Sequence, residues 1–384
     1  MQKLRIGVNL LYLRPGRVGG SETYVRAVLK EMPRLTDKVE FQVFGSRECI
    51  DTFTPSTSFQ LQAVHEKPFN QISRLWYENV CLGKWVSNLD LLWSPTNFIA
   101  PGLPKKTSQV ATIYDLQHRW YPQNFSVFQC LIRELLFQFT FQQAISWMAI
   151  SEFSRRDALQ RYNADPARSH SVLLGADFPQ KPTSEQTSEI LKKYNLLDPY
   201  FYFPATMAPH KGHAFLLDAY AEAARKADAK IPKLVLTGQK GKIWPSISQK
   251  IEELGLSDSV THLGYVPRND VVALLSEATA MLFPSRFEGF GLPVLEAMSL
   301  NTPVLASRNT AIQEVAGKGA WLLDTYDHEE WATAMVQISR DASLRKEWIQ
   351  KGLKNNQRFS WEKCARETLK ILVQSSSKPN LMVI

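Results

Sequence analysis

Two glutamates lie eight positions apart in a segment rich in glycine and aromatic residues. Glu288 and Glu296 belong to the run Phe-Pro-Ser-Arg-Phe-Glu-Gly-Phe-Gly-Leu-Pro-Val-Leu-Glu-Ala-Met, which covers residues 283–298. Pro293 favours the first turn of a helix, where a missing N–H costs nothing. Glycine lets a ligand approach the backbone, and the free amides of a helix start attract anions. We expect such amides near Gly291, Leu292 and Val294. The segment predicts an anion site flanked by two carboxylates that can accept hydrogen bonds from sugar hydroxyls.

Short apolar runs that alternate with amphipathic stretches are expected to position this loop. Such alternation is typical of a parallel sheet covered by helices, the doubly wound α/β class. In the second half we expect strands at 200–203, 233–236, 260–263, 280–283, 303–306 and 320–323, and helices at 214–227, 245–254, 269–278, 293–299 and 312–316. In the first half we expect strands at 4–10, 40–44, 90–93, 108–113 and 147–150. Two such sheets facing each other would form an interdomain cleft, and ligands of open α/β sheets bind beyond the carboxyl ends of the strands.

The length of 384 residues favours two domains. We expect a first domain at 1–177 and a second at 193–358, joined by a linker at 178–192, a segment that carries prolines, serines and threonines. A helix at 359–374 is expected to return to the first domain, and the tail 375–384 is expected to be disordered.

Composition excludes a disordered chain, since 44% of the residues are hydrophobic and 21% are charged. Lysine and arginine outnumber aspartate and glutamate by 45 to 37, which indicates an anionic partner. The first 30 residues alone hold six basic residues and one acid. The four cysteines are scattered without metal or redox spacing, and the stretch 125–150 carries charges that a membrane span would lack. A cytoplasmic protein, with contact at the inner face of the membrane, is expected.

Taken together, these segments resemble the family 4 retaining glycosyltransferases of GT-B architecture. The spacing of Glu288 and Glu296 matches the Glu-x7-Glu motif of that family. The other similar segments are Gly19-Gly20, 150–154, 174–177, 209–213, 263–267, 302–304 and 314–317. The resemblance implies two facing Rossmann-like sheets and transfer of a hexose from a sugar nucleotide to a glycan or lipid-linked glycan. UDP-glucose is the expected donor and GDP-mannose the next, in polysaccharide biosynthesis.

The resemblance also assigns roles to residues. Glu296 would hold the donor ribose, and Glu288 would contact the transferred sugar. Backbone around Tyr265 and Val266 would meet the nucleobase. The remaining residues expected at the donor are Gly19, Gly20, His210, Arg286, Phe290, Gly291 and Leu292.

Lys211 is the residue expected to neutralise the leaving diphosphate. Its developing charge needs a metal, cations or oriented amides. The sequence contains no Asp-x-Asp pair, so we expect no metal and no cofactor. Relatives often carry an arginine at the position of Ala205, and His210 or Arg286 would have to replace it.

In the first half, many relatives carry a histidine directly before Asp115, where this chain has Tyr114. Either Tyr114 replaces that histidine at the transferred sugar or the acceptor, or His118 supplies its function from one turn later. A histidine buried for structural reasons is the plainer interpretation of His118.

The basic residues of the first domain allow two interpretations. Arg26, Lys30 and Arg34 share one helix face, which is either solvated or directed, with Arg14 and Arg17, at an anionic acceptor or membrane. The aromatic stretch 125–141 either packs in the core or enters a membrane interface.

Two other functional classes fit the sequence less well. A nicotinamide-dependent Rossmann enzyme is disfavoured because residues 7–20 lack the dinucleotide glycine spacing. A basic nucleic-acid-binding protein is disfavoured because the sequence contains no recognition motif, so no nucleic-acid partner is expected.

Overall fold

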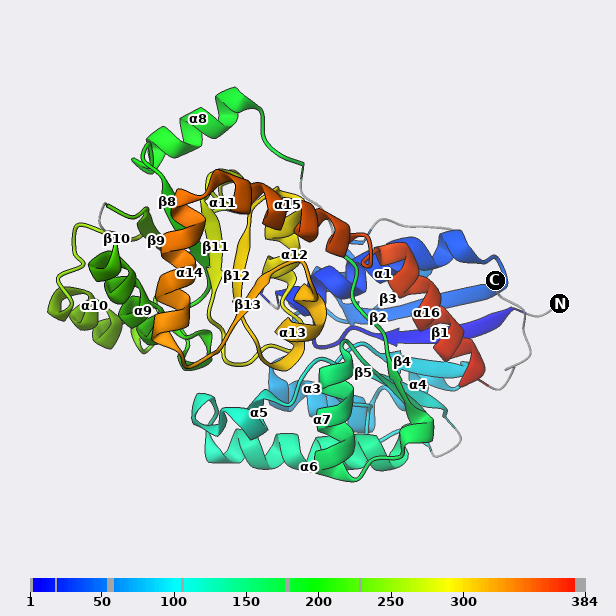
Figure 1. Ribbon diagram of the computed structural model, residues 1–384. Coiled ribbons are helices and arrows are strands. Elements are labelled where there is room, and N and C mark those ends of the chain that lie inside the picture. The colour runs from blue at the N-terminus through cyan, green and yellow to red at the C-terminus, as the bar shows by residue number, and fades with distance from the viewer. Residues whose placement is uncertain are drawn as a thin grey trace. The chain divides into compact units, whose positions relative to one another are not determined.

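A computed structural model describes residues 3–17, 19–53, 59–104, 107–176, 180–227 and 230–376, with Gln71 and Ile72 described by their backbone alone. The chain divides into two units (Figure 1). Unit 1 comprises Met1–Gly175 and Phe359–Ile384, and unit 2 comprises Ala176–Arg358.

Unit 1 contains a seven-stranded parallel sheet in the order β3-β2-β1-β4-β5-β6-β7. Its strands are β1 (Leu4–Asn9), β2 (Val39–Ser46), β3 (Phe59–His65), β4 (Leu91–Ser94), β5 (Gln109–Ile113), β6 (Ser146–Ala149) and β7 (Ser169–Ser171). Its helices are α1 (Gly20–Leu35), α2 (Arg47–Ile50), α3 (Gln71–Val80), α4 (Gly83–Val86), α5 (Gln117–Trp120), α6 (Val127–Gln143), α7 (Glu152–Tyr162) and α16 (Trp361–Gln374).

Sequence patterning missed the two outermost strands of this sheet. The strands β3 and β7 lie at its edges, and most of their residues are only partly buried. The interior strands β4, β5 and β6 are buried throughout. A strand buried on both faces reads as a continuous apolar run, whereas an edge strand does not, so only the interior strands carried a clear signal.

Helix α16 brings the end of the chain back to unit 1. Ser360 caps it by accepting a hydrogen bond from the Lys363 amide at 3.0 Å. It packs alongside α1 (Figure 1), where the rings of Tyr24 and Trp361 lie 6.4 Å apart. The chain continues as a hydrogen-bonded turn through Ser376, so the start of the expected disordered tail is structured. The rest of that tail, 377–384, lies outside the described residues.

Unit 2 contains a six-stranded parallel sheet in the order β10-β9-β8-β11-β12-β13. Its strands are β8 (Tyr200–Pro204), β9 (Lys233–Thr237), β10 (Val260–His262), β11 (Ala280–Phe283), β12 (Val304–Ser307) and β13 (Trp321–Leu323). Its helices are α8 (Ser184–Lys193), α9 (His213–Lys226), α10 (Trp244–Glu253), α11 (Arg268–Glu277), α12 (Leu292–Ser299), α13 (Thr310–Ala316), α14 (His328–Arg340) and α15 (Ala342–Asn356). All six strands expected here are present, and the two sheets confirm the doubly wound α/β class.

The expected linker at 178–192 is wrong over most of its length. Residues 184–193 form α8, and Thr183 and Gln186 form a capping box at its start. Beyond the helix, Lys193 Nζ and Tyr194 Oη donate to Asp270 on α11 at 2.7 and 2.8 Å. Of the serines and threonines that suggested a loop, Thr183 is the capping residue of α8, Ser184 and Ser188 are exposed on the helix, and Thr187 is buried. Residues 177–179 of the expected linker lie outside the described residues.

Each sheet has one point at which the strand order reverses direction. In unit 1 this switch point lies between β1 and β4, and in unit 2 it lies between β8 and β11. Open α/β sheets bind ligands outside the carboxyl ends of the strands at such a point. A ligand site is therefore expected at the loops that follow these four strands.

Candidate functional site

The glycine-rich loop 284–291 follows β11 at the switch point of unit 2. The start of α13 holds it in place. Asn309 Nδ2 donates to the carbonyls of Ser285 and Arg286, each at 3.2 Å. The Glu288 amide donates to Thr310 Oγ1 at 3.2 Å. Thr310 has a φ of 44°, an uncommon value for a β-branched residue, and such outliers cluster at functional sites. The sequence did not single out Asn309 or Thr310, because neither belongs to the motif at 283–298.

Lys211 and Glu288 meet at this switch point, although they lie 77 positions apart. Lys211 Nζ donates to Glu288 Oε1 at 2.7 Å, and neither side chain is more than 19% exposed. The Arg286 amide also donates to the His210 carbonyl at 2.7 Å. The loops after β8 and β11 are therefore joined by one backbone hydrogen bond and one ion pair, and four of the sequence-predicted residues come together.

Gly212 makes this approach of the two loops possible. Its φ is 80°, and a Cβ at this position would lie 2.4 Å from the Pro284 carbonyl oxygen. Any side chain would thus push apart the segments that carry Lys211 and Glu288.

His210 and Arg286 were the two candidates to replace the arginine missing at Ala205. Burial, together with the charge of Lys211, lowers the pKa of His210 to about 4 against the opposing effect of Glu288. His210 is thus neutral at physiological pH and supplies no cation there. The guanidinium of Arg286 lies 5.1 Å from the ring centre of Tyr326, and its buried Nε makes no hydrogen bond within the described residues. Arg286 remains the candidate for the second cation.

Helix α12 begins as expected, with one correction. Gly291 has a φ of 107° and precedes the first turn, which contains Pro293. The Val294 amide, expected to be free, donates to the Gly291 carbonyl at 3.0 Å. It is used inside the first turn and is not available to an anion. Phe290 and Leu292 border this turn, and Phe290 is buried.

Glu296 is held by a residue that the sequence did not single out. Arg268 Nη1 and Nη2 donate to its two carboxylate oxygens at 2.9 and 2.5 Å. Arg268 opens α11 and is half exposed, while Glu296 is largely buried. Between β10 and α11, Tyr265 is 75% exposed and Val266 is buried. The expected contact of the nucleobase with the backbone around Tyr265 and Val266 stays a prediction.

In unit 1, Gly19 and Gly20 lie where the sequence placed them, after β1 and at the start of α1. Gly19 has a φ of 63° and is the residue before the helix. Glu22 Oε2 accepts a hydrogen bond from the Gly16 amide at 2.8 Å, which ties the preceding loop to the first turn. Val18 lies outside the described residues.

Tyr114 and His118 have different surroundings. The Tyr114 hydroxyl donates to the Pro95 carbonyl at 2.8 Å, and burial raises its pKa, so the phenol is neutral. The ring of His118 stacks on Phe137 at 5.1 Å, and its Nε2 lies 3.4 Å from Glu134 Oε2. Burial lowers the pKa of His118 while Glu134 raises it. His118 thus belongs to the packing of α5 against α6, which supports the structural interpretation, and a role in catalysis remains a prediction.

The basic face of α1 is largely paired. Arg26 Nε donates to Glu22 at 2.8 Å and its Nη2 to Thr52 Oγ1 at 2.7 Å, while Arg34 pairs with Glu31 at 3.1 Å. This pattern supports the interpretation as a solvated helix face.

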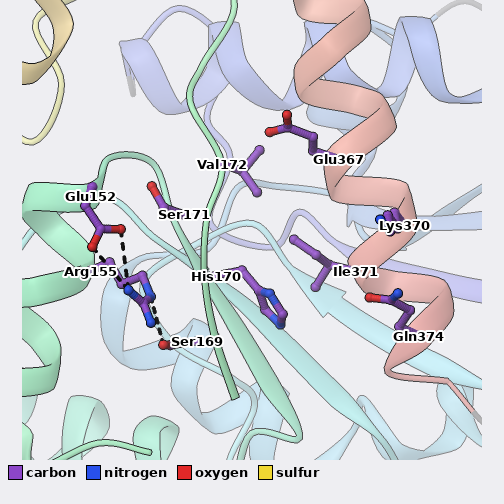
Figure 2. Close-up of a pocket in the computed structure, with 10 residues that line it drawn as sticks. All are labelled: Glu152, Arg155, Ser169, His170, Ser171, Val172, Glu367, Lys370, Ile371 and Gln374. Carbon is purple, nitrogen blue, oxygen red and sulfur yellow. Dashed lines mark hydrogen bonds and ion pairs between the residues drawn. The ribbon is translucent and has the colours of Figure 1, made fainter. Parts of the chain in front are cut away.

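Figure 2 shows a cavity of about 430 Å³ in unit 1, between α7, β7 and α16. Arg155 Nη1 donates to Glu152 at 3.1 Å and its Nε to Ser169 Oγ at 2.9 Å. Glu367 and Lys370 add one charge of each sign from α16. The arginine of this cavity is satisfied by its neighbours, so we assign the cavity no ligand.

Within the described part of the chain, no cluster of three or more His, Cys, Asp or Glu residues could hold a metal ion. The same residues include no helix with the length and apolar character needed to span a bilayer.

The protein family that the sequence matches is represented in unit 2. Residues 186–355 match the family model described as glycosyl transferases group 1. An O-antigen chain mannosyltransferase B from Escherichia coli is 32% identical over 226 residues, which are 58% of each chain. An O-antigen chain mannosyltransferase from Salmonella typhimurium is 26% identical over 62% of this chain and 63% of its own. The match therefore spans about six tenths of the length of these relatives.

Solved structures are similar to nearly the whole chain. A sucrose-phosphate synthase from Thermosynechococcus elongatus aligns with a TM-score of 0.75 at 18% identity, over 97% of this chain and 99% of its own. An Anabaena protein, HepE, solved in complex with UDP and glucose, aligns with a TM-score of 0.74 at 18% identity, over 97% and 100%. Likeness at this identity establishes the fold alone. The chain thus has the GT-B α/β fold, and most of its unit 2 matches the group 1 glycosyl transferases.

Proposed function

We propose that this protein is a hexosyltransferase that moves a sugar from a sugar nucleotide to a glycan or lipid-linked glycan in polysaccharide biosynthesis. The observation that carries the proposal is the pairing of Lys211 with Glu288 at the switch point of unit 2, next to the start of α12. A cation, a carboxylate and a helix start are the groups that a sugar diphosphate requires. The family match and the relatives named mannosyltransferases support the same activity.

The proposed mechanism is retaining and needs neither metal nor a strong protein base. Lys211 would stabilise the charge that develops on the leaving diphosphate, with Arg286 as the second cation. The departing phosphate would accept the proton of the acceptor hydroxyl on the same face as the bond that breaks. Neutral His210 fits this scheme as a packing residue between the two loops, because its pKa of about 4 leaves it uncharged.

The donor is proposed to be GDP-mannose first and UDP-glucose second, the reverse of the order expected from the sequence. Several relatives matched by sequence are named mannosyltransferases, at up to 32% identity, and others are named D-inositol 3-phosphate glycosyltransferases at up to 29%. The structure with UDP and glucose shares 18%. A thermal-shift comparison of GDP, UDP and their sugars distinguishes the two donors, because a bound ligand stabilises the folded state by RT ln(1 + [L]/Kd).

Replacement of Lys211 and of Glu296 by alanine tests the donor site. We expect each variant to lose transfer activity by ~100-fold or more while its thermal unfolding midpoint stays close to that of the unmodified protein, because each removes a charge-assisted contact to the donor. Lys226→Ala, which removes an exposed lysine of α9, is the matched control and should retain activity. Near-normal turnover in both variants would refute the assignment. Activity that excess EDTA abolishes would refute metal independence.

We also propose that unit 1 binds peripherally to an anionic membrane through one face of α6. Phe137 and Phe141 of this helix are buried in the core. The side chains on its other face are between 56% and 88% exposed, namely Val127, Phe128, Leu131 and Leu135. Apolar faces of this kind mark interaction surfaces, and an amphipathic helix can lie in a bilayer interface. The buried face of α6 supports the core interpretation of the stretch 125–141, and the exposed face is the part for which membrane contact is proposed.

A further inference from the structure

A second cavity of unit 1 lies at the switch point of its sheet. It has a volume of about 450 Å³, within the range of ~300–1000 Å³ typical of small-molecule sites. Tyr12 and Arg14 reach it from the segment after β1, and Asn97 reaches it from the segment after β4. Its position is the one at which open α/β sheets bind ligands. The cavity therefore corresponds, in unit 1, to the position of the Lys211 site in unit 2.

The lining of this cavity is strongly basic. It includes four arginines and no acidic residue, namely Arg14, Arg17, Arg74 and Arg133. Two carboxylates outside the lining offset part of this charge: Glu78 Oε2 lies 3.7 Å from Arg74 Nε, and Asp115 acts on Arg133 through its charge. Two acids near four guanidinium groups leave a positive excess.

Two of these guanidinium groups lack a hydrogen bond at Nε in the described part of the chain, although Arg74 forms the ion pair with Glu78 and the Arg133 guanidinium lies 4.7 Å from the ring centre of Phe125. The Nε atoms of Arg74 and Arg133 are buried and make no hydrogen bond within the described residues. Burial lowers the pKa of Arg133, and the charge of Arg74 lowers it further while Asp115 opposes both. The fold thus holds like charges close together at the edge of a cavity. An anion that accepts several hydrogen bonds would relieve both the repulsion and the missing partners.

Hydrogen bonds also hold two of the lining residues, Arg14 and Asn97, in place. Arg14 Nε and Nη2 donate to the Phe69 carbonyl at 3.0 and 2.5 Å, which anchors this arginine to the start of α3. The Tyr114 amide donates to Asn97 Oδ1 at 2.7 Å. Arginines fixed in this way lose little side-chain freedom when a ligand binds. Tyr114, expected from the sequence at the transferred sugar or the acceptor, instead supports the wall of this cavity.

We propose that this cavity binds the diphosphate group of the acceptor. The proposal rests on the proposed function, since it names the acceptor class of that reaction. A single carboxylate, with one charge and two oxygens, would leave most of the four guanidinium groups unpaired. A diphosphate carries several charges and several terminal oxygens, which planar guanidinium groups can contact in pairs. The charged groups assigned to the donor diphosphate, Lys211 and Arg286, lie in unit 2, and only the backbone of Gly19 and Gly20 is expected at that diphosphate from unit 1. The arginines of this cavity are therefore left for the other substrate.

Titration calorimetry of the full chain with inorganic pyrophosphate tests the site directly. We expect Arg133→Gln and Arg14→Gln each to weaken pyrophosphate binding by about tenfold or more, because each removes charge-assisted hydrogen bonds. Arg133→Lys keeps the charge and should lose less. Arg34→Gln, at an exposed arginine that pairs with Glu31, should bind as the unmodified protein does. Thermal unfolding midpoints establish that each variant is folded.

Three further ligands distinguish the source of the diphosphate. Geranyl diphosphate should compete with pyrophosphate and lose affinity in the same variants, as a lipid-linked acceptor would. UDP and GDP should bind all variants within about twofold, and vesicles of phosphatidylglycerol should bind them equally. Parallel loss of UDP and GDP binding would assign the cavity to the donor, and parallel loss of vesicle binding would assign it to lipid headgroups. Either result would overturn the proposal, as would pyrophosphate binding that Arg133→Gln and Arg14→Gln leave unchanged.

These binding measurements do not depend on turnover. A protein that transfers no sugar from any nucleotide, yet loses pyrophosphate affinity in the expected variants, would refute the proposed function and still support a diphosphate site. A protein that transfers sugar equally well to acceptors with and without a diphosphate would refute the acceptor assignment alone.

Discussion

At the scale of single residues, one buried histidine is expected to make the stability of unit 2 sensitive to acid. His213 lies at the start of α9, with its ring 4.7 Å from that of Phe203. Burial, with smaller contributions from the nearby His262 and Lys211, lowers the pKa of His213 to about 4. The folded state therefore prefers the neutral ring, whereas the unfolded chain takes up a proton near pH 6.5. The stability contributed by this histidine is complete above pH 6.5 and is lost as the pH falls toward 4.

We expect His213→Leu to reduce the acid sensitivity of unit 2. Between pH 7 and pH 5 a histidine shifted in this way costs about 2 kcal/mol of unfolding free energy, an upper estimate for a site that can relax. The thermal unfolding midpoint of the variant should fall by several degrees less over this range than that of the unmodified protein. His328→Leu, at an exposed histidine of the same unit, is the control. Equal acid sensitivity in all three proteins would contradict the interpretation.

At the scale of the elements, substitutions of two glycines distinguish two causes of lost unfolding free energy, which are backbone strain and steric overlap. Gly212 and Gly255 have similar φ angles of 80° and 67°. A Cβ at Gly212 would meet the Pro284 oxygen at 2.4 Å, whereas a Cβ at Gly255 would have no atom within 4 Å. We expect Gly255→Ala to lower the unfolding free energy by about 1 kcal/mol through backbone strain alone. Gly212→Ala should cost several times more and should also reduce transfer, because it displaces Lys211 from Glu288.

Urea unfolding and initial rates of transfer check this pair of glycine variants. Equal losses of unfolding free energy in both variants would contradict the prediction, because the loops after β8 and β11 could then move apart without a loss of stability.

The exposed face of α6 makes a second prediction at this scale. The double variant Leu131→Glu, Leu135→Glu should lose sedimentation with phosphatidylglycerol vesicles, because two carboxylates would enter the apolar and anionic interface. Its fold should be unchanged, since both side chains are more than half exposed. Leu197→Glu, at an equally exposed leucine of unit 2, should bind vesicles normally. Vesicle binding that survives the double change would refute membrane contact through α6.

At the scale of the whole molecule, the last helix completes a unit that begins at the other end of the chain. The residues of α16 that are fully or nearly fully buried include Cys364, Ala365, Leu369 and Leu372. Burial of side chains such as these leucines contributes about 1.5–3 kcal/mol each. We expect a chain truncated after Arg358 to lose the cooperative unfolding of unit 1 and most of its soluble yield. A chain truncated after Ser376 is the control and should unfold as the full chain does. A cooperative transition of unit 1 without α16 would contradict this role.

Local sequence patterns predicted much of the fold and the identity of several site residues. The interior strands β8, β9, β11 and β12 of unit 2 are largely buried apolar runs, while its edge strands β10 and β13 are mostly only partly buried. The glycines and prolines of 284–293 give a local signal for a loop and a helix start. Patterns failed where the signal was weak or ambiguous. The edge strands β3 and β7 lack a continuous apolar run, and the capping residues of α8 resemble a linker.

The sequence by itself predicted two doubly wound α/β units, which the structure confirms. It also predicted a loop for an anion with Lys211 as its cation, and this stays a prediction. Only the tertiary structure decided which charges meet. It pairs Lys211 with Glu288 and Arg268 with Glu296, and it gathers Arg14, Arg74 and Arg133 at one cavity. The physical reason is that residue patterns report local backbone preference and burial. Contacts between distant residues depend on strand order, which brings together the carboxyl ends of β1 with β4 and of β8 with β11.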